Sequence, residues 1–254
     1  MNDDVADGKA TMFYLRGLAN SPTINLTDNI GTGIKRGVDV QGGLTGTVTF
    51  DRLGITAGST NYGLGFNFAD AAINNITFQN FMLHDFLYPI DINMTSAAGV
   101  LNFYNGTIDV DRAQYFGLRV RDFGHTINMK NCLFHGTPES GHVYVQIAGS
   151  NPTFTADYNA YESAGDYWNW QGTTDIAFAA WQSNADSNGV NADPQLTAAL
   201  RPQAAAVYNG GDSSVLPKTD FSGTPWFSGT GIGAMNRLCG WRTIESGTSV
   251  TIAN

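Results

Sequence analysis

The chain has 254 residues and a formal charge of −9; 14% of its residues are charged, 42% are apolar and 30 are glycine. The apolar content excludes a wholly disordered chain, and the excess of acidic side chains argues against nucleic acid as the main partner. No apolar run reaches the length of a membrane span and the acidic start shows no signal-peptide pattern, so we expect no membrane association.

The sequence divides into three parts. Residues 1–22 form a lead-in or contact segment, in which the short apolar run 10–15 could add a strand or dock on a partner. Residues 23–165 carry a repeat of hydrophobic alternation, and residues 166–254 are expected to form capping coils and a tail. This organisation predicts one repeat domain rather than several globular ones.

Alternating apolar residues recur about every 26 residues in the middle part. The strands of a first column begin at Ile24, Val48, Ile76, Leu101, Ile127 and Phe154. Those of a second column begin at Val38, Leu64, Ile90, Leu118 and Val145, and those of a third at Ile55, Leu83, Ile108, Phe134 and Tyr161. Three strand columns with one period predict three faces per coil, whereas propeller blades need about 40 residues each. The expected fold is all-β, a single-stranded right-handed parallel β-helix (solenoid) with an irregular C-terminal cap.

Two internal stacks follow from this register. Phe50, Phe78, Phe103 and Met129 should form one interior column, each side chain touching the next. Asn80, Asn105 and Asn131 occupy equivalent corner positions, flanked in the neighbouring rungs by Arg52 and Tyr158. Because asparagine tolerates the left-handed conformation and its amide can bond across a rung of about 4.8 Å, these three residues are expected to form a structural ladder inside the corner.

The chain beyond residue 155 departs from the repeat and carries a series of motifs in order. They are the segments 157–161 (DYNAY), 178–182 (FAAWQ), 186–189 (DSNG), 193–196 (DPQL) and 231–234 (GIGA). This order resembles the final coils of the right-handed parallel β-helix superfamily that includes many polysaccharide lyases. The resemblance implies a DPQL strand and a final GIGA strand, although the usual Phe of the former is Leu196 here and no Ser-Pro-Ala follows Arg201-Pro202. It implies the fold, because these signature residues build structure rather than a site.

The last rung of a solenoid needs a cover, and four tryptophans in this part suit that role: Trp168, Trp170, Trp181 and Trp226. Stacking of Trp168 or Trp170 on a sugar ring is the alternative interpretation. The low charge and the abundance of Gly, Asn and Thr also resemble β-helix proteins of bacteriophage particles, such as tail spikes and capsid decoration proteins.

A first group of candidate site residues lies one position beyond the third column. His84, Asp109 and His135 would be neighbours on consecutive rungs, with Asp111 two residues farther along. Such a trio can ligate a metal or transfer protons. The competing interpretation is a surface stack in which one carboxylate neutralises two imidazoles, and we assign no resident metal to it.

A second group lies on the outer surface of the second face. The expected row is Asp39, Gly65, Asp91, Arg119 and Gln146, beside a row of Gln41, Asn67, Asn93 and Arg121. Asp91 and Arg119 should form a cross-rung salt bridge. Planar polar side chains on a flat sheet are what glycan binding uses, so Asp91, Asn93, Arg119 and Arg121 are the candidate glycan-binding residues, against the alternative of a plain solvated face.

The sequence contains no G-x-S-x-G elbow, P-loop, H-E-x-x-H motif or paired C-x-x-C. No catalytic residue is therefore assigned and no cofactor is expected. The leading hypothesis is a virion-associated structural β-helix, decorating a phage head or forming a tail spike and having affinity for a surface polysaccharide. The alternatives are a carbohydrate-active enzyme of the same fold, a polysaccharide lyase or glycoside hydrolase, and a secreted adhesin-type module.

Assembly and cysteine chemistry complete the expectations. The runs 10–15 and 248–252 are predicted to contact other chains, either in a homotrimer or among other virion proteins. Cys132 and Cys239 are interpreted as two buried thiols, with a disulfide as the alternative.

Overall fold

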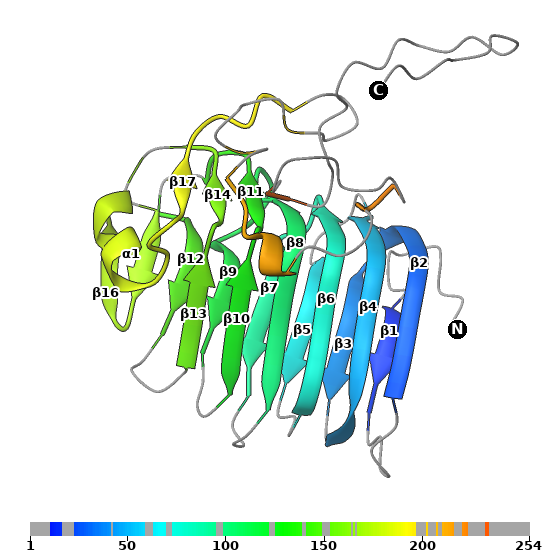
Figure 1. Ribbon diagram of the computed structural model, residues 1–254. Coiled ribbons are helices and arrows are strands. Elements are labelled where there is room, and N and C mark those ends of the chain that lie inside the picture. Colours follow the sequence, from blue (N-terminus) through cyan, green and yellow to red (C-terminus); the bar gives the residue numbers. More distant parts are fainter. Residues whose placement is uncertain are drawn as a thin grey trace, which may run out of the picture.

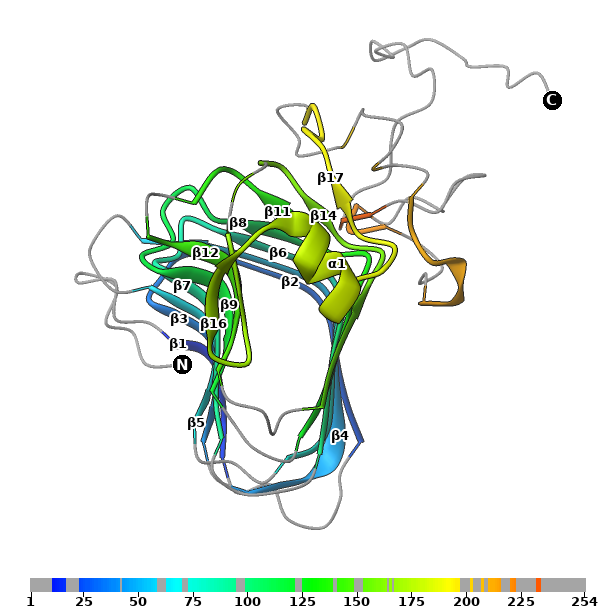
Figure 2. The same cartoon turned by 90° about the vertical axis from the view of Figure 1, so that its left-hand side faces the viewer.

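The protein is a parallel β-helix of about six turns. The computed structural model describes residues 11–16, 23–41, 43–58, 63–69, 73–94, 99–121, 125–138, 141–148, 153–163, 165, 167–196, 202, 207, 210–215, 220–222 and 232–233. Strands of successive turns lie side by side along the coil (Figure 1), and the view along its axis shows them enclosing one interior (Figure 2). The all-β solenoid predicted from the repeat is thus confirmed.

One sheet forms the second face of the coil. Its strands, in spatial order, are β1 (Thr11–Leu15), β3 (Arg36–Gln41), β5 (Leu64–Ala69), β7 (Tyr88–Asn93), β9 (Phe116–Val120), β12 (Val143–Ile147), β15 (Trp168–Trp170) and β16 (Thr173–Ile176). All neighbours are parallel except β15 and β16, which are antiparallel. The reversal between β15 and β16 marks the end of the regular stack.

The other sheet bends and so supplies the first and third faces. It contains β2 (Thr23–Ile34), β4 (Leu44–Ala57), β6 (Ile73–His84) and β8 (Val100–Asp109), which run through the bend, followed by the shorter β10 (Thr126–Lys130), β11 (Leu133–His135), β13 (Thr153–Asp157), β14 (Ala160–Tyr161) and β17 (Val190–Asn191). In each rung the bend is a residue with positive φ, namely Asp28, Arg52, Asn80, Asn105, Asn131 and Tyr158. The left-handed residue turns the chain by a sharp angle without breaking the ladder of parallel strands.

The predicted register of the first and third columns is confirmed along the chain. Ile24, Val48, Ile76, Leu101, Ile127 and Phe154 are successive partners, and so are Ile55, Leu83, Ile108, Phe134 and Tyr161. The second column is correct except at Leu64, which pairs with Arg36 and Tyr88. Phe66, two residues later, is the partner of Val38 and Ile90.

The interior column contains a run of stacked aromatic rings, as predicted. The rings of Phe50 and Phe78 are parallel with centroids 4.9 Å apart, and those of Phe78 and Phe103 follow at 5.4 Å. Phe66 packs on Phe78 from the opposite sheet at 4.1 Å. Met129 continues the column in register with Phe103, and all five side chains are fully buried. Aromatic packing of this kind joins the two sheets through the centre of the coil.

The asparagine corner is buried, but its bonding differs from the predicted ladder. Asn80, Asn105 and Asn131 are each inaccessible to solvent, and no bond between two of their amides is found. The Asn80 amide nitrogen donates to Asp51 at 2.9 Å. Asn131 donates to the Asp212 carbonyl and accepts from the Asp212 amide, so its side chain faces outward under a later segment. The predicted burial of the three corner positions is present, and Asn131 bonds to Asp212 rather than to a neighbouring asparagine.

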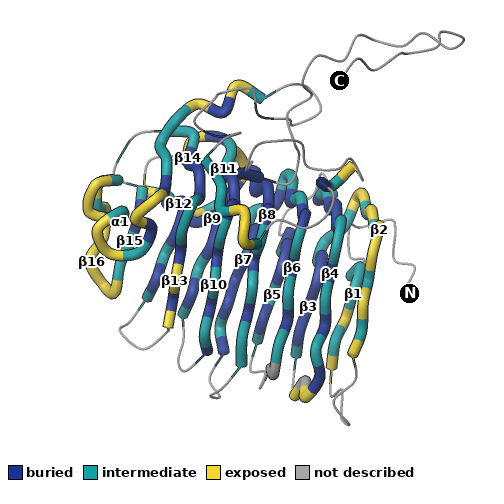
Figure 3. The backbone as a smooth tube through the Cα atoms, viewed as in Figure 1, coloured by how far each residue is buried: buried dark blue, intermediate teal, exposed yellow. Residues whose placement is uncertain are grey.

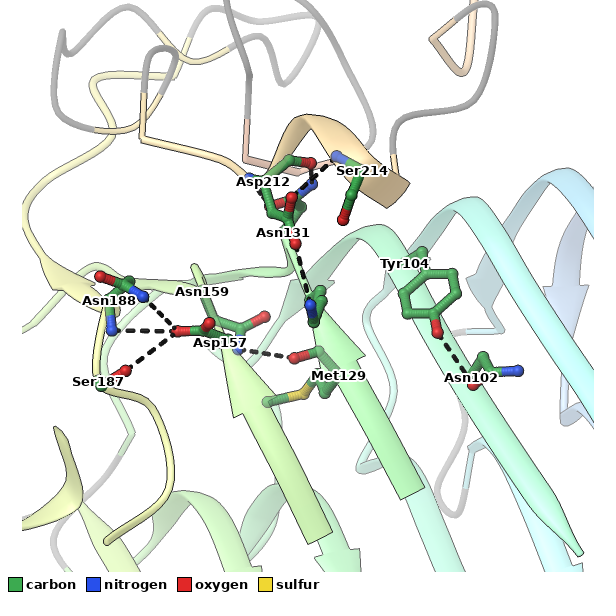
Figure 4. A network of polar contacts seen from close by, with 11 residues as sticks. Asn102, Tyr104, Met129, Asn131, Asp157, Asn159, Ser187, Asn188, Asp212 and Ser214 are labelled. Carbon is green, nitrogen blue, oxygen red and sulfur yellow. Dashed lines mark hydrogen bonds and ion pairs between the residues drawn. The ribbon is translucent and has the colours of Figure 1, made fainter. Parts of the chain in front are cut away.

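That later segment packs along the outer side of the coil near the bend (Figures 1 and 4). Besides the Asp212 contacts, Lys130 Nζ lies 2.9 Å from the Asp212 carboxylate, and the Gly233 amide donates to the Asn131 carbonyl. Ile232 and Val207 form a small second core with Leu133 and Ala160. Residues 213–215 form a single turn of 3-10 helix beside it. The expected final strand at 231–234 is not present at its two described residues, and residues 193–196 are in neither a strand nor a helix.

The cap at the C-terminal end is built around α1 (Phe178–Asn184) and the loop that follows it. Trp181 on α1 and Trp168 on β15 are both fully buried, which confirms their predicted covering role. Trp181 Nε1 donates to the Tyr161 hydroxyl, and this hydroxyl donates to Asp186 Oδ2 at 2.9 Å. Asn159 also donates to Asp186 Oδ2, so the loop is tied to the last rung by a buried polar network. Trp226 lies outside the described residues.

The N-terminal end is less covered. Figure 3 shows exposed positions along β2, in contrast to the buried strands of the middle rungs. The run that the sequence predicts to add a strand or to dock on a partner forms β1, which pairs in parallel with β3 of the same chain. Residues 248–252 lie outside the described part, as does Cys239, whereas Cys132 is a buried free thiol whose pKa burial raises to about 12. Among the described residues no helix has both the length and the apolar character needed to cross a bilayer.

Candidate functional site

The outer surface of the second face carries a continuous polar row. Asp39, Asn67, Asp91, Arg119 and Gln146 are successive partners in neighbouring strands. Asn67 therefore occupies the place predicted for Gly65, and Ala69 occupies the place predicted for Asn67, beside Gln41 and Asn93. A side chain at Gly65 would collide with the Pro89 carbonyl at 2.3 Å and approach core Leu83, so this position faces inward.

Asp91 is the centre of the row and joins the two predicted arginines. Arg119 reaches both of its carboxylate oxygens, with Nε 3.0 Å from Oδ1 and Nη2 2.8 Å from Oδ2. Arg121 adds a contact of 3.1 Å to Oδ2. The predicted cross-rung salt bridge is thus present, and it is bidentate. Two guanidinium groups share one carboxylate, which leaves this part of an acidic protein with a local positive charge.

Packing against the protein surface holds the Arg119–Asp91 pair in place. The Arg119 guanidinium lies over the Phe116 ring, 4.2 Å from its centroid, and Asp91 is 6% exposed. Arg121 remains 39% exposed at its side chain. Farther along the row, Asp39 is saturated by Arg36, Gln41 and Asn67. The Arg121 guanidinium beside the row is consequently the part open to a ligand. Asn93 lies at the end of β7, in register with Ala69.

An aromatic stripe lies next to this row and was missed by the sequence reasoning. Tyr115 is 52% exposed, and its ring lies 5.3 Å from the His142 ring and 6.4 Å from the Tyr88 ring. Tyr88 also packs on Phe116 at 5.5 Å, and its hydroxyl donates to Gln114. The three residues come from successive rungs but stand just before or at the strand starts, so the strand alternation gave no signal for them.

The second predicted group also comes together, on the third face. His84 Nε2 lies 3.1 Å from Asp109 Oδ2, and His84 Nδ1 lies 3.1 Å from Asp85 Oδ2. His135 is the strand partner of Asp109, as predicted, but its Nδ1 contacts Glu162. Asp111 donates its backbone amide to Asp109 Oδ1, and its own carboxylate accepts from the Thr137 amide. The consecutive positions are thus His84, Asp109, His135 and Glu162, with Asp85 beside them.

The burial of Asp109 sets the electrostatics of this group. Its side chain is 7% exposed, and desolvation raises the pKa of its carboxyl, partly offset by the Asp111 amide and by His84. Glu162 could have been found by extending the third column one more rung, since it follows Tyr161 as His135 follows Phe134. Asp85 sits in a left-handed turn (φ 62°), which no repeat pattern indicates.

A pocket of about 350 Å³ adjoins the group on the side of the first rungs. Ile30, Met82 and Phe221 form its apolar walls, and His84 lies at its edge. Phe221 also occupies the space over Gly54, where an added Cβ would meet its ring at 2.7 Å.

Of the two tryptophans considered for sugar stacking, Trp168 is not available for it. Trp168 has no exposed surface, so its side chain cannot stack on a ligand. Trp170 is half-buried against Trp181 and Phe154, with ring centroids 5.8 Å and 6.4 Å away. The exposed aromatic surface near the predicted arginines is Tyr115 instead.

Comparison of the chain with protein-family models, with curated proteins and with solved structures gives no match. The strand pairing shows the parallel β-helix architecture, and the C-terminal motifs only resemble those of the superfamily.

Proposed function

We propose that this protein is a structural β-helix of a bacteriophage particle, a head decoration or tail spike, whose second face binds a surface polysaccharide. The observation that carries the binding part is exposed Tyr115, with half-buried Tyr88 and His142 beside it, next to the Asp91–Arg119–Arg121 group. Sugar rings present apolar C–H faces and hydroxyl edges, so a glycan site needs a flat aromatic surface next to fixed planar donors and acceptors.

The Tyr115 ring supplies the flat surface, and the Tyr88 and His142 rings pack beside it at interplanar angles of 30° and 64°. Tyr88, Tyr115 and His142 come from successive turns and follow the coil axis, with neighbouring ring centroids 6.4 Å and 5.3 Å apart. The arginines supply fixed donors, because Asp91 and the Phe116 ring hold the Arg119 guanidinium in place. An array held by the backbone loses little conformational entropy when it binds an extended chain.

The particle assignment rests on other features. The rigid solenoid, the low charge and the Gly/Asn/Thr-rich sequence suit a protein whose task is to project from or strengthen a surface. Self-assembly into a homotrimer, or contact with other virion proteins, is part of this proposal. Because β1 pairs with β3 on one side and is the terminal strand of its sheet, we place a contact between chains at this end of the coil.

A carbohydrate-active enzyme is the second candidate, and the third-face group is the observation that favours it. Asp109 is a buried carboxyl with a raised pKa, and Glu162 lies two rungs away, about 9.6 Å along the stack. Inverting glycosidases use a general acid and a second carboxylate about 6.5–9.5 Å apart, and the spacing of the two rungs lies at the upper limit of this range. His135 stands between the two, which is the argument against this reading.

The experiment is native affinity electrophoresis through gels that contain, one at a time, a panel of bacterial surface polysaccharides. The wild-type chain should be retarded by at least one of them, and Tyr115→Ala and Arg121→Ala should each abolish most of the retardation. Tyr104→Ala, an outward tyrosine on the first face, is the matched control and should migrate as the wild type does. Migration unaffected by every polysaccharide, or equal loss in the control, would contradict the binding proposal.

Release of oligosaccharides from the retarding polysaccharide distinguishes the enzyme alternative. We expect no product with the wild-type chain. Product formation that disappears in Asp109→Asn would replace the structural proposal by the enzymatic one. Light scattering of the purified chain tests the assembly, for which a trimer or larger species is expected.

A further inference from the structure

We propose that His84 and Asp109 form a binding site for a late first-row divalent metal ion such as Zn²⁺, and that Asp85 orients His84 for this purpose. This site goes beyond the proposed glycan binding, because it lies on the third face and uses none of the second-face residues. His84, Asp85 and Asp109 each offer a ligand atom, and the three atoms lie within 4.8 Å of one another.

The hydrogen bonds of the imidazole select the ligand nitrogen. Asp85 Oδ2 lies 3.1 Å from Nδ1, and Asp85 Oδ1 is held by Arg112 at 3.6 Å. A carboxylate on one ring nitrogen keeps the proton there and turns the lone pair of the other nitrogen outward, an arrangement typical of metal-binding histidines. Nε2 also faces a carboxylate, at 3.1 Å from Asp109 Oδ2, so a cation would bind between these two atoms in place of the proton while Asp85 keeps the proton on Nδ1.

The Asp109 carboxylate is held in an orientation that would allow it to bind a cation. Asp109 Oδ1 accepts from the Asp111 amide, which fixes the group and leaves Oδ2 directed at His84. Nε2 and Oδ2 are 3.1 Å apart, close to the roughly 3.4 Å between two ligands of a tetrahedral ion with bonds of about 2.1 Å. A shift of a few tenths of an ångström would admit the ion.

The exposure of the group fits an open site. The His84 side chain is 41% exposed and that of Asp109 is 7% exposed, so one ligand is anchored in the protein and the other borders solvent. Water would complete the coordination of an ion bound there. A nitrogen ligand favours Zn²⁺, Co²⁺ or Ni²⁺ over Mg²⁺, which prefers oxygen ligands.

The test is equilibrium dialysis of the full chain against Zn²⁺, with Co²⁺ absorption as a second readout. We expect one saturable Zn²⁺ per chain, at least tenfold weaker binding in His84→Ala and Asp109→Asn, and 10–100-fold weaker binding in Asp85→Asn. The thermal midpoint of Asp85→Asn in metal-free buffer should equal that of the wild type, which separates positioning from folding. His142→Ala is the matched histidine control and should bind as the wild type does.

Four outcomes would overturn the proposal. They are no saturable Zn²⁺ uptake by the wild type, unchanged uptake in His84→Ala, equal loss in His142→Ala, and Mg²⁺ binding as strong as Zn²⁺ binding. Bound Co²⁺ whose absorption bands shift in His84→Ala but not in His142→Ala would support direct ligation by His84, whatever the effect of either substitution on stability.

Discussion

Asp186 links the stability of the C-terminal cap to pH. Its carboxyl is fully buried between Asn159 and Tyr161, and burial raises its pKa from 3.8 to about 6. The folded cap therefore holds a proton that the unfolded chain releases near pH 4. This contribution to stability is fully present below pH 3.8 and is lost as the pH rises through about 6.

The magnitude follows from the two pKa values. Each pKa unit corresponds to about 1.4 kcal/mol, so the whole contribution is about 3 kcal/mol, of which about 2 kcal/mol is lost between pH 4 and pH 7. Asp186→Asn keeps a carbonyl oxygen for the Tyr161 and Asn159 donors and cannot ionise. Between pH 4 and pH 7 the free energy of unfolding of the wild type should therefore fall by about 2 kcal/mol more than that of Asp186→Asn.

Urea unfolding followed by tryptophan fluorescence at pH 4, 5, 6 and 7 measures this difference, because Trp181 donates to Tyr161 in the same network. Asp175→Asn, an exposed acidic residue on β16, is the control and should keep the wild-type pH dependence. Parallel curves for Asp186→Asn and the wild type from pH 4 to pH 7 would refute the account of a buried, protonated carboxyl.

Three further predictions concern the coil. Phe103→Ala should lower the free energy of unfolding by about 3–5 kcal/mol in denaturant titrations, because it removes a fully buried ring from the aromatic stack, and Phe103→Leu should lower it by less. A loss below about 1 kcal/mol for Phe103→Ala would mean that the stack is not part of the core. Asn131→Ala should lower the free energy of unfolding by about 1–3 kcal/mol and speed hydrogen exchange at the Asp212 amide, which donates a hydrogen bond to Asn131 Oδ1. An unchanged exchange rate would argue against the outward packing of Asn131. Gly106→Ala should cost about 1–3 kcal/mol by the same titration, because the added Cβ would lie 2.0 Å from Phe81 Cζ, and a neutral effect would show that Phe81 can move away.

The strand columns could be predicted because burial acts on every second residue of a strand. Along the first and third columns the apolar positions recur at one spacing, and the pairing follows them throughout. The prediction for the second column was wrong at Leu64 because Leu64, Phe66 and Phe68 alternate with smaller or polar residues, so either Leu64 or Phe66 could have been the partner of Val38 and Ile90. The deciding feature is Gly65, which faces inward next to inward Phe66 at a corner and so breaks the alternation.

The sites could be predicted only as far as they follow the repeat. Asp91–Arg119 and His84–Asp109 are strand-register neighbours or nearly so, and the spacing brought them together. Tyr115, Asp85 and the Asp212 contact depend on turns or on a segment 81 residues from its partner Asn131. No local pattern encodes such a contact, because the residues that form it share neither a strand nor a period.

The most direct test of the central claim is the affinity of the second face for a polysaccharide that retards the wild-type chain. Isothermal titration with fragments of that polysaccharide should give saturable binding for the wild type and for Tyr104→Ala. The double variant Tyr115→Ala/Arg121→Ala should bind at least tenfold more weakly, with an unchanged circular dichroism spectrum. Equal affinity of the double variant and the wild type would contradict the claim that this face is the glycan-binding surface.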